Sequence, residues 1–229
     1  MDTSRIAMVI GREGLEKLQK AKIAVIGLGG VGSYVAEALV RSGIGTLLII
    51  DGDTVDSSNV NRQLPALQST LGKAKTAVMA KRLLDINPAC KITSVGSFYK
   101  PGEFTVFFPA DCDWIIDAID DTASKVDIIK ECKARNMSII SACGTGNKMD
   151  PTLLKVADLS KTSVCPLARS LRGKLKKLGI TKGVPVVFST EMPQKLTAGR
   201  TPGSMVFVPA SAGLLLASYV VRQLLARPE

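Results

Sequence analysis

A glycine-rich run is the clearest candidate for ligand binding in this chain of 229 residues. The run GLGGVGS follows a short apolar segment, precedes an amphipathic helical pattern and holds Gly27, Gly29, Gly30 and Gly32. Glycines let the backbone turn tightly and approach a phosphate, and the N–H groups that open the next helix attract negative charge. Asp51 ends the next apolar segment, 24 residues after Gly27, where a carboxylate can bind ribose hydroxyls. The pattern predicts an adenine nucleotide; a purely structural glycine turn is the alternative.

Two cations after this carboxylate favour a triphosphate over a dinucleotide. Arg62 and Lys75 follow Asp51 in the chain. A diphosphate on a helix N-terminus needs no such cluster, whereas charge that develops on an α-phosphate does. The chain has no histidine and no Tyr-x-x-x-Lys, so it lacks the usual acid–base groups of hydride transfer. Ser-His-Asp, Cys-His and histidine-metal chemistry are excluded for the same reason. The alternative is that both cations are ordinary surface charges.

Three carboxylates at the end of a later apolar segment suggest a metal site. Asp117 lies within the segment, and Asp120 and Asp121 follow it. In open parallel sheets this position lies beside the crevice where ligands bind, and a carboxylate there can hold Mg²⁺ against phosphates. We predict that Asp120 binds Mg²⁺ and that Asp117 is structural. Capping of the next helix by Asp120 or Asp121 is the alternative.

The elements that must position these residues alternate between strands and helices. The apolar patterns predict strands at residues 22–26, 46–50, 91–95, 114–119, 138–141 and 184–189. They predict helices at residues 13–20, 30–41, 74–86, 124–135, 166–178 and 210–226, with a loop at 192–203. This order is typical of an α/β fold, a Rossmann-like, doubly wound, mainly parallel sheet with a C-terminal extension. We expect a single domain over residues 1–229, with a nucleotide-binding core at 1–150 and a basic, substrate-binding part at 151–229.

Positive charge is concentrated in the last third of the chain. The net charge is +10, of which +9 falls in residues 159–229, and residues 159–190 contain no Asp or Glu. A one-sided basic region indicates a polyanion partner, and a solvated helix face is the alternative. The predicted helix at 166–178 should direct a leucine stripe inward and present its cations to nucleic acid: Arg169, Arg172, Lys174, Lys176 and Lys177. Aromatic residues are only 4% of the chain, so phosphate contact rather than base stacking should dominate.

The composition of the chain indicates its compartment and argues against a membrane span. The five cysteines form no C-x-x-C pair, which argues against a zinc knuckle, a thioredoxin-type site and a secreted disulfide framework. Charged residues in the first turns give no signal-peptide pattern, so we expect a cytoplasmic protein. The uncharged run at 201–221 is broken by prolines and glycines, so we expect a core helix there and no membrane span.

Several of these motifs together resemble the superfamily of adenylating enzymes related to ThiF, MoeB and the ubiquitin-activating enzymes. The discriminating part is GLGGVGS followed by D-x-D-x-V-x-x-x-N-x-N-R-Q and then G-x-x-K. The resemblance implies that Asp51 binds ribose, and that Asn59, Arg62 and Lys75 bind the triphosphate of ATP. It also implies that Asp120 binds Mg²⁺ and that Arg5 reaches the nucleotide of the partner subunit in a homodimer.

Within this superfamily the chain is similar to the tRNA threonylcarbamoyladenosine dehydratases. The shared segments include IGREGLEKL at 10–18, NRQLPAL at 61–67 and PLAR at 166–169. The resemblance implies ATP-dependent cyclisation of the threonylcarbamoyl group on the tRNA adenosine beside the anticodon, with AMP and pyrophosphate as products. It leaves open a sulfur-transfer protein as a further partner. Cys165 stands where this subgroup usually has Asp.

Two other functions compete with this interpretation. One is adenylation of the C-terminal glycine of a ubiquitin-like sulfur carrier, as in ThiF and MoeB. The absence of zinc-binding cysteine pairs and the basic last third weigh against it. The other is a nucleotide-sensing module without turnover. The presence of three residues suited to catalysis argues against it: Arg62, Lys75 and Asp120. If the chain is a dehydratase, the ring closes by attack of a nucleophile within the substrate itself. The enzyme then needs to position the substrate and does not need a catalytic cysteine.

Overall fold

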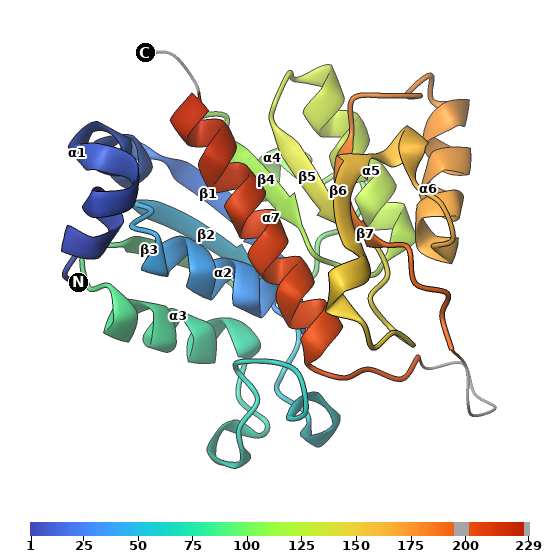
Figure 1. The fold of residues 1–229 in the computed structure, drawn as a ribbon. Coiled ribbons are helices and arrows are strands. Elements are labelled where there is room, and N and C mark those ends of the chain that lie inside the picture. The colour runs from blue at the N-terminus through green and yellow to red at the C-terminus, as the bar shows by residue number, and fades with distance from the viewer. Residues whose placement is uncertain (195–201, 227–229) are drawn as a thin grey trace.

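A sheet of seven strands organises the chain (Figure 1). The computed structural model describes residues 1–194 and 202–226. The strand order is β3-β2-β1-β4-β5-β7-β6, and within the described residues β6 alone runs antiparallel to its neighbour. The strands are β1 (Lys22–Ile26), β2 (Thr46–Ile50), β3 (Lys91–Val95), β4 (Trp114–Asp117), β5 (Ile139–Ala142), β6 (Leu154–Asp158) and β7 (Pro185–Ser189). The expected doubly wound, mainly parallel α/β sheet is confirmed. The sheet continues across residue 150, and the proposed division of roles there stays a prediction.

Helices cover both faces of the sheet. Figure 1 shows α7, in red, lying across the face that α2 also covers, with α5 and α6 on the other side. The α-helices are α1 (Ser4–Lys20), α2 (Gly32–Arg41), α3 (Lys75–Ile86), α4 (Phe104–Phe107), α5 (Thr122–Ala134), α6 (Pro166–Lys177) and α7 (Phe207–Ala226). Short 3₁₀ turns lie at Ser57–Asn59, Gln68–Thr70, Pro151–Leu153 and Leu159–Lys161.

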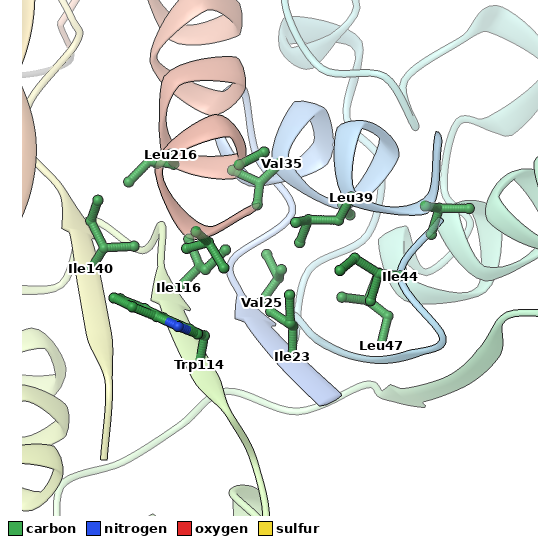
Figure 2. Close-up of a cluster of buried hydrophobic side chains, with 14 of the residues drawn as sticks. Ile23, Val25, Val35, Leu39, Ile44, Leu47, Trp114, Ile116, Ile140 and Leu216 are labelled. Atoms are coloured by element: carbon green, nitrogen blue, oxygen red, sulfur yellow. The ribbon is translucent and has the colours of Figure 1, made fainter. Parts of the chain in front are cut away.

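The alternation of side chains along β1 divides the core into two layers. Ile23 and Val25 face α2 and α7, where they pack with residues such as Val35 and Leu216 (Figure 2). Ala24 and Ile26 face the opposite layer, which α4, α5 and α6 cover. Successive side chains of a strand point to opposite faces, so a strand buried on both sides is apolar throughout. This explains why the central strands are mostly apolar, with Asp117 in β4 and Ser141 in β5 as buried polar exceptions.

Helix α7 is the core helix expected from the sequence. It is the one described helix long and apolar enough to cross a membrane by composition. In the structure its buried residues, among them Val208, Leu216 and Val220, join the core beneath α2. A Cβ at Gly213 would lie 2.5 Å from the carbonyl oxygen of Val31, so this glycine lets α7 approach the start of α2.

The sequence pattern did not predict strand β6 or helix α4, and it predicted only the second half of helix α1. Strand β6 lies at the sheet edge with mostly half-buried residues, so its apolar alternation is weak. Helix α4 is a single turn made mostly of aromatic and β-branched residues, which are poor helix formers. Helix α1 begins at Ser4 rather than near Glu13, and Gly11 interrupts it with a φ of 74°. Residues 195–201 of the predicted loop lie outside the described residues.

A buried ion pair joins β4, β5 and α5 beneath the carboxyl ends of the strands. The Nζ atom of Lys125 lies 2.8 Å from Asp117 Oδ2, and both side chains are fully buried. The same ammonium donates to Ser141 Oγ at 3.0 Å and to the carbonyl oxygen of Ala142 at 2.9 Å. Ser141 Oγ in turn donates to Asp117 Oδ2 at 2.6 Å. All three ammonium donors are therefore used. The geometry agrees with the structural role predicted for Asp117.

Replacing Lys125 by Met should lower the free energy of unfolding by about 3–5 kcal/mol, because Asp117 would stay buried without its cation. Urea unfolding followed by circular dichroism measures this. The matched control is Lys130→Met on the same helix, where the side chain is 48% exposed and pairs with Asp127 and Glu131. The control should keep a wild-type urea midpoint. Equal losses in the two variants would show that the buried pair has no special role.

Candidate active site at the carboxyl ends of the strands

A cleft of about 510 Å³ opens at the carboxyl ends of β1, β2 and β4. This is where ligands of open α/β sheets bind. Its walls include eight of the residues predicted from the sequence: Gly27, Gly29, Gly30, Asp51, Asn59, Arg62, Lys75 and Asp120. Gly32 is not among the lining residues, and neither are Arg5 and the cations of α6. The strand–loop–helix order of the sequence therefore brings most of the predicted nucleotide site to one place.

The glycines of the loop have different tasks. Gly27 adopts a φ of 88°, and a Cβ there would lie 2.8 Å from the carbonyl oxygen of Ala118. A Cβ at Gly32 would lie 1.7 Å from the carbonyl oxygen of Gly27, so only glycine fits. These two glycines shape the turn itself. At Gly29 a Cβ would meet only Gln63 Nε2, at 3.8 Å, so the backbone there faces open space in which a phosphate can approach.

Asp51 is fixed by the glycine loop and by its own turn. Its Oδ2 accepts a hydrogen bond from the N–H of Leu28 at 2.6 Å. Its Oδ1 accepts from the N–H of Asp53 at 2.8 Å. The carboxylate is half-buried at the end of β2, beside the glycines. Each oxygen retains a lone pair for a further donor, such as a ribose hydroxyl.

The two predicted cations are both anchored. Lys75, at the start of α3, is 4% exposed, and its Nζ lies 3.0 Å from Asp53 Oδ2. Arg62 Nη1 donates to the carbonyl oxygen of Ser58 at 2.7 Å and to Asn61 Oδ1 at 2.9 Å. Both side chains line the cleft, and their role in binding a triphosphate stays a prediction. An anion in the cleft would meet two positive charges already held in position.

Asn59 holds the short turn that carries Arg62. Its Oδ1 accepts a hydrogen bond from the N–H of Asp56 at 3.2 Å, and Asp56 Oδ1 accepts from the N–H of Ser58 at 2.8 Å. This reciprocal capping fixes the 3₁₀ turn Ser57–Asn59. Asn59 is 9% exposed and still lines the cleft, so its geometry suits both positioning of the loop and contact with a phosphate.

The two carboxylates after β4 have different roles: one caps helix α5, and the other is exposed at the cleft. Asp121 caps α5, since its Oδ2 accepts from the N–H of Ser124 at 2.7 Å. This bond lowers the pKa of the Asp121 carboxyl. Asp120 is exposed at the cleft. No group of three metal-ligating side chains occurs in the described part of the chain. One carboxylate fits Mg²⁺ nevertheless, because this ion often takes a single carboxylate together with substrate phosphates and water.

Phe98 is a cleft residue that sequence reasoning missed. It lies just beyond β3, and its side chain is 62% exposed although it is large and apolar. A Cβ at Gly52 would lie 2.6 Å from this ring, so the ring rests flat against glycine backbone next to Asp51. An exposed aromatic face beside the predicted ribose site can stack on a base. Its position just after a predicted strand was the one feature of the sequence that could have marked Phe98 as a cleft residue.

Cys143 and Cys165 lie together, a contact that the sequence did not indicate. Cys143 lines the cleft, and Cys165, 2% exposed, precedes the first turn of α6. A hydrogen bond from Cys143, helped by the N–H groups of Ala168 and Gly144, lowers the pKa of the Cys165 thiol to about 5. Burial opposes this shift, and the ammonium of Lys148 favours it. Lys148 is itself 5% exposed and donates to the carbonyl oxygen of Gly144 at 3.2 Å, and burial lowers its pKa.

The predicted nucleic-acid residues lie on α6, outside the cleft. Leu171 and Leu175 are buried, as predicted, in the core layer that α5 also covers, whereas Leu178 is 49% exposed beyond the end of the helix. The cations occupy the remaining faces. Arg172 alone of the five is half-buried, and the other four are exposed: Arg169, Lys174, Lys176 and Lys177.

Arg5 lies on the first turns of α1 and is exposed. The break at Gly11 separates these turns from the rest of the helix, which is buried at Leu18. Met8 and Val9, on the same turns, are 83% and 84% exposed. Arg5 is not among the residues that line the cleft.

The protonation of Cys165 should couple to stability with a definite sign. Its folded-state pKa lies below the ordinary value of 9.0, so folding favours the thiolate. This contribution is present above the ordinary pKa and is lost as the pH falls through about 5. Thiolate ultraviolet absorbance should therefore titrate near pH 5 in the wild type and be absent in Cys165→Ser. The control is Cys90→Ser, because burial raises the pKa of Cys90 to about 11. A thiolate midpoint near 9 would contradict the assignment.

Comparison with known proteins agrees with this geometry. The chain is 44% identical to tRNA threonylcarbamoyladenosine dehydratase of Bacillus subtilis, over 97% of this chain and 94% of that protein. It is 35% identical to the Escherichia coli protein of that name, over 96% and 92%. A crystal structure of E. coli TcdA in complex with ATP superposes with a TM-score of 0.93 at 37% identity, covering 97% of this chain and 93% of that one. The ThiF family model matches residues 3–229, and the chain belongs to the ThiF family.

Proposed function

We propose that the protein is an ATP-dependent tRNA threonylcarbamoyladenosine dehydratase. The observation that carries this proposal is the full-length similarity to relatives of that name together with a cleft lined by the predicted nucleotide residues. One solved relative binds ATP, and that structure covers 97% of this chain. These relatives favour the tRNA substrate over adenylation of a sulfur-carrier protein. The enzyme would act in the cytoplasm, without a membrane.

ATP occupies the cleft with its phosphates on the glycine loop. Gly29 leaves open space at the N-terminus of α2, whose N–H groups favour an anion. Asp51 holds the ribose, and Phe98 provides an apolar face for the base. Arg62, Lys75 and Asn59, which line the cleft, would bind the triphosphate. Asp120 would hold Mg²⁺, which neutralises phosphate charge when bound.

The reaction takes two steps in one cleft. An oxygen of the threonine carboxylate attacks the α-phosphorus, and pyrophosphate leaves. The carbamoyl group then attacks the activated carbonyl, AMP leaves, and the ring closes with net loss of water from the substrate. Arg62 and Lys75 stabilise the charge that develops on the phosphates in the first step. The second step is intramolecular, so it requires a held geometry more than a protein nucleophile.

The tRNA would approach over α6 and the other cations of the last third. Exposed arginines and lysines on this helix provide phosphate contacts independent of base sequence. The protein would work as a homodimer in which Arg5 serves the cleft of the partner subunit. Two features support this assembly. The turns that carry Arg5 are set apart by Gly11, and they expose Met8 and Val9.

Loss of either cation should impair catalysis more than folding. Lys75→Ala and Arg62→Ala are each expected to lower the rate of cyclisation more than tenfold, because charge on the α-phosphate loses its stabilisation. The measurements are pyrophosphate release and mass spectrometry of the tRNA nucleosides. Lys73→Ala is the control, since Lys73 is exposed and lies outside the cleft. Wild-type rates in both variants would remove these residues from the site. Turnover with a carrier protein but not with tRNA would favour the alternative function.

A shared active site predicts complementation between two inactive variants. In a mixed dimer of Arg5→Ala and Lys75→Ala subunits, one cleft carries both changes and the other carries neither. Random exchange at equal concentrations makes half of the dimers mixed, and each mixed dimer has one unaltered cleft of two. Mixing should therefore restore about a quarter of wild-type turnover. Subunit exchange is verified by native mass spectrometry of differently tagged chains. No recovery after verified exchange would contradict a shared site.

A further inference from the structure

A second cavity, of about 350 Å³, lies between α6 and the residues that precede β7. We call it the α6 cavity. Its apolar lining comes from Leu159, Leu175, Ile180 and Val184. Four cations surround these residues: Arg169, Arg172, Lys176 and Lys182. The cavity shares no lining residue with the nucleotide cleft.

The α6 cavity has a net positive charge, because four cations and one carboxylate line it. Its one acidic lining residue is Asp158, and both carboxylate oxygens are already engaged. Oδ1 accepts from Ser160 N and Oγ at 2.8 and 2.6 Å, and Oδ2 accepts from the N–H groups of Gly183 and Val184 at 2.6 and 3.1 Å. None of the four cations forms an ion pair with a described residue. An apolar floor inside a ring of free cations suits a ligand with a flat apolar body and a phosphate.

Arg172 presents a fixed guanidinium to this space. Its Nη1 donates to the carbonyl oxygen of Thr162 at 3.0 Å and also to Thr162 Oγ1. A guanidinium plane held in this way can stack on an unpaired base, which is how many proteins recognise single-stranded RNA without an aromatic residue. The other three cations are exposed and can reach phosphates.

The two sites lie along one helix. Leu167 lines the nucleotide cleft, and Gly173, six residues further along α6, lines the α6 cavity. At the rise of an α-helix this is about 9 Å, so a single polymer can occupy both sites. A small free ligand cannot span both sites, so their proximity would not increase its affinity.

We propose that the α6 cavity binds an unstacked nucleotide of the tRNA, close in the chain to the adenosine that enters the nucleotide cleft. The base lies on the apolar floor against Arg172, and the adjacent phosphates contact Arg169, Lys176 and Lys182. This inference rests on the proposed function, and it assigns a specific place to part of the substrate.

Filling the cavity tests the proposal without disturbing the fold. A Cβ at Gly173 would meet no atom within 4 Å, so Gly173→Leu places a side chain in the cavity and also improves helix propensity. The matched control is Ser170→Leu, which adds the same side chain on an exposed position of α6 outside the cavity. Gly173→Leu should weaken tRNA binding at least tenfold in an anisotropy titration. Ser170→Leu should bind as the wild type does, and both should keep wild-type ATP affinity without tRNA. Equal tRNA affinities in the two variants would overturn the proposal.

A second pair of variants separates the cavity from the outer face of the helix. Lys176→Gln with Lys182→Gln removes two cations of the cavity, whereas Lys174→Gln with Lys177→Gln removes two that lie outside it. The first pair should flatten the log–log salt dependence of tRNA binding by about 0.7–0.9 for each lost contact. If only the second pair flattens the salt dependence of tRNA binding, the tRNA lies on the outer face of α6. That result would refute binding in the α6 cavity, while the proposed function would stand. Wild-type protein that neither binds nor cyclises the modified tRNA would instead refute the proposed function.

Discussion

One buried ammonium holds together the part of the sheet on which the cleft is built. Lys125 reaches from α5 to Asp117 at the end of β4, and to Ser141 and Ala142 at the end of β5. Ala142 and the residue after Asp117, Ala118, are themselves cleft residues. A charge removed from water is stable only when its partners are held in place, and here the partners belong to neighbouring strands. The network therefore fixes the separation of β4 and β5 and the direction of the loops that leave them.

Backbone rather than side chains shapes most of the cleft. Gly27 and Gly32 pack backbone against backbone at the start of α2, and Gly144 and Gly146 form part of the opposite wall. Side chains that carry charge are few, and short turns orient them. This division explains how a cleft can be open enough for a nucleotide and a bulky tRNA group, yet hold Arg62 and Lys75 in fixed positions.

Much of the fold and most of the cleft could be predicted because they depend on patterns within short stretches of sequence. Gly27, Asp51 and Asp120 each follow a buried apolar strand, and parallel strands bring their carboxyl ends to one edge. What the sequence did not reveal depends on packing between distant segments. The pairing of Lys125 with Asp117 and the contact of Cys165 with Cys143 need the folded sheet, and the cation ring of the α6 cavity needs the turn before β7. The weak alternation of β6 and the break at Gly11 left too little local pattern to predict.

The strand order has a consequence for how this chain folds as it is synthesised. β1 lies between β2 and β4, but about 90 residues separate β1 from β4, so at typical elongation rates β1 waits about 5–20 s for its second neighbour. During that time one edge of β1, which is apolar after Lys22, has unpaired backbone groups, and such an edge is a template for association with other chains. Helix α7, which covers this part of the sheet, is made last. The nascent protein thus passes through an interval in which this edge of β1 is unprotected.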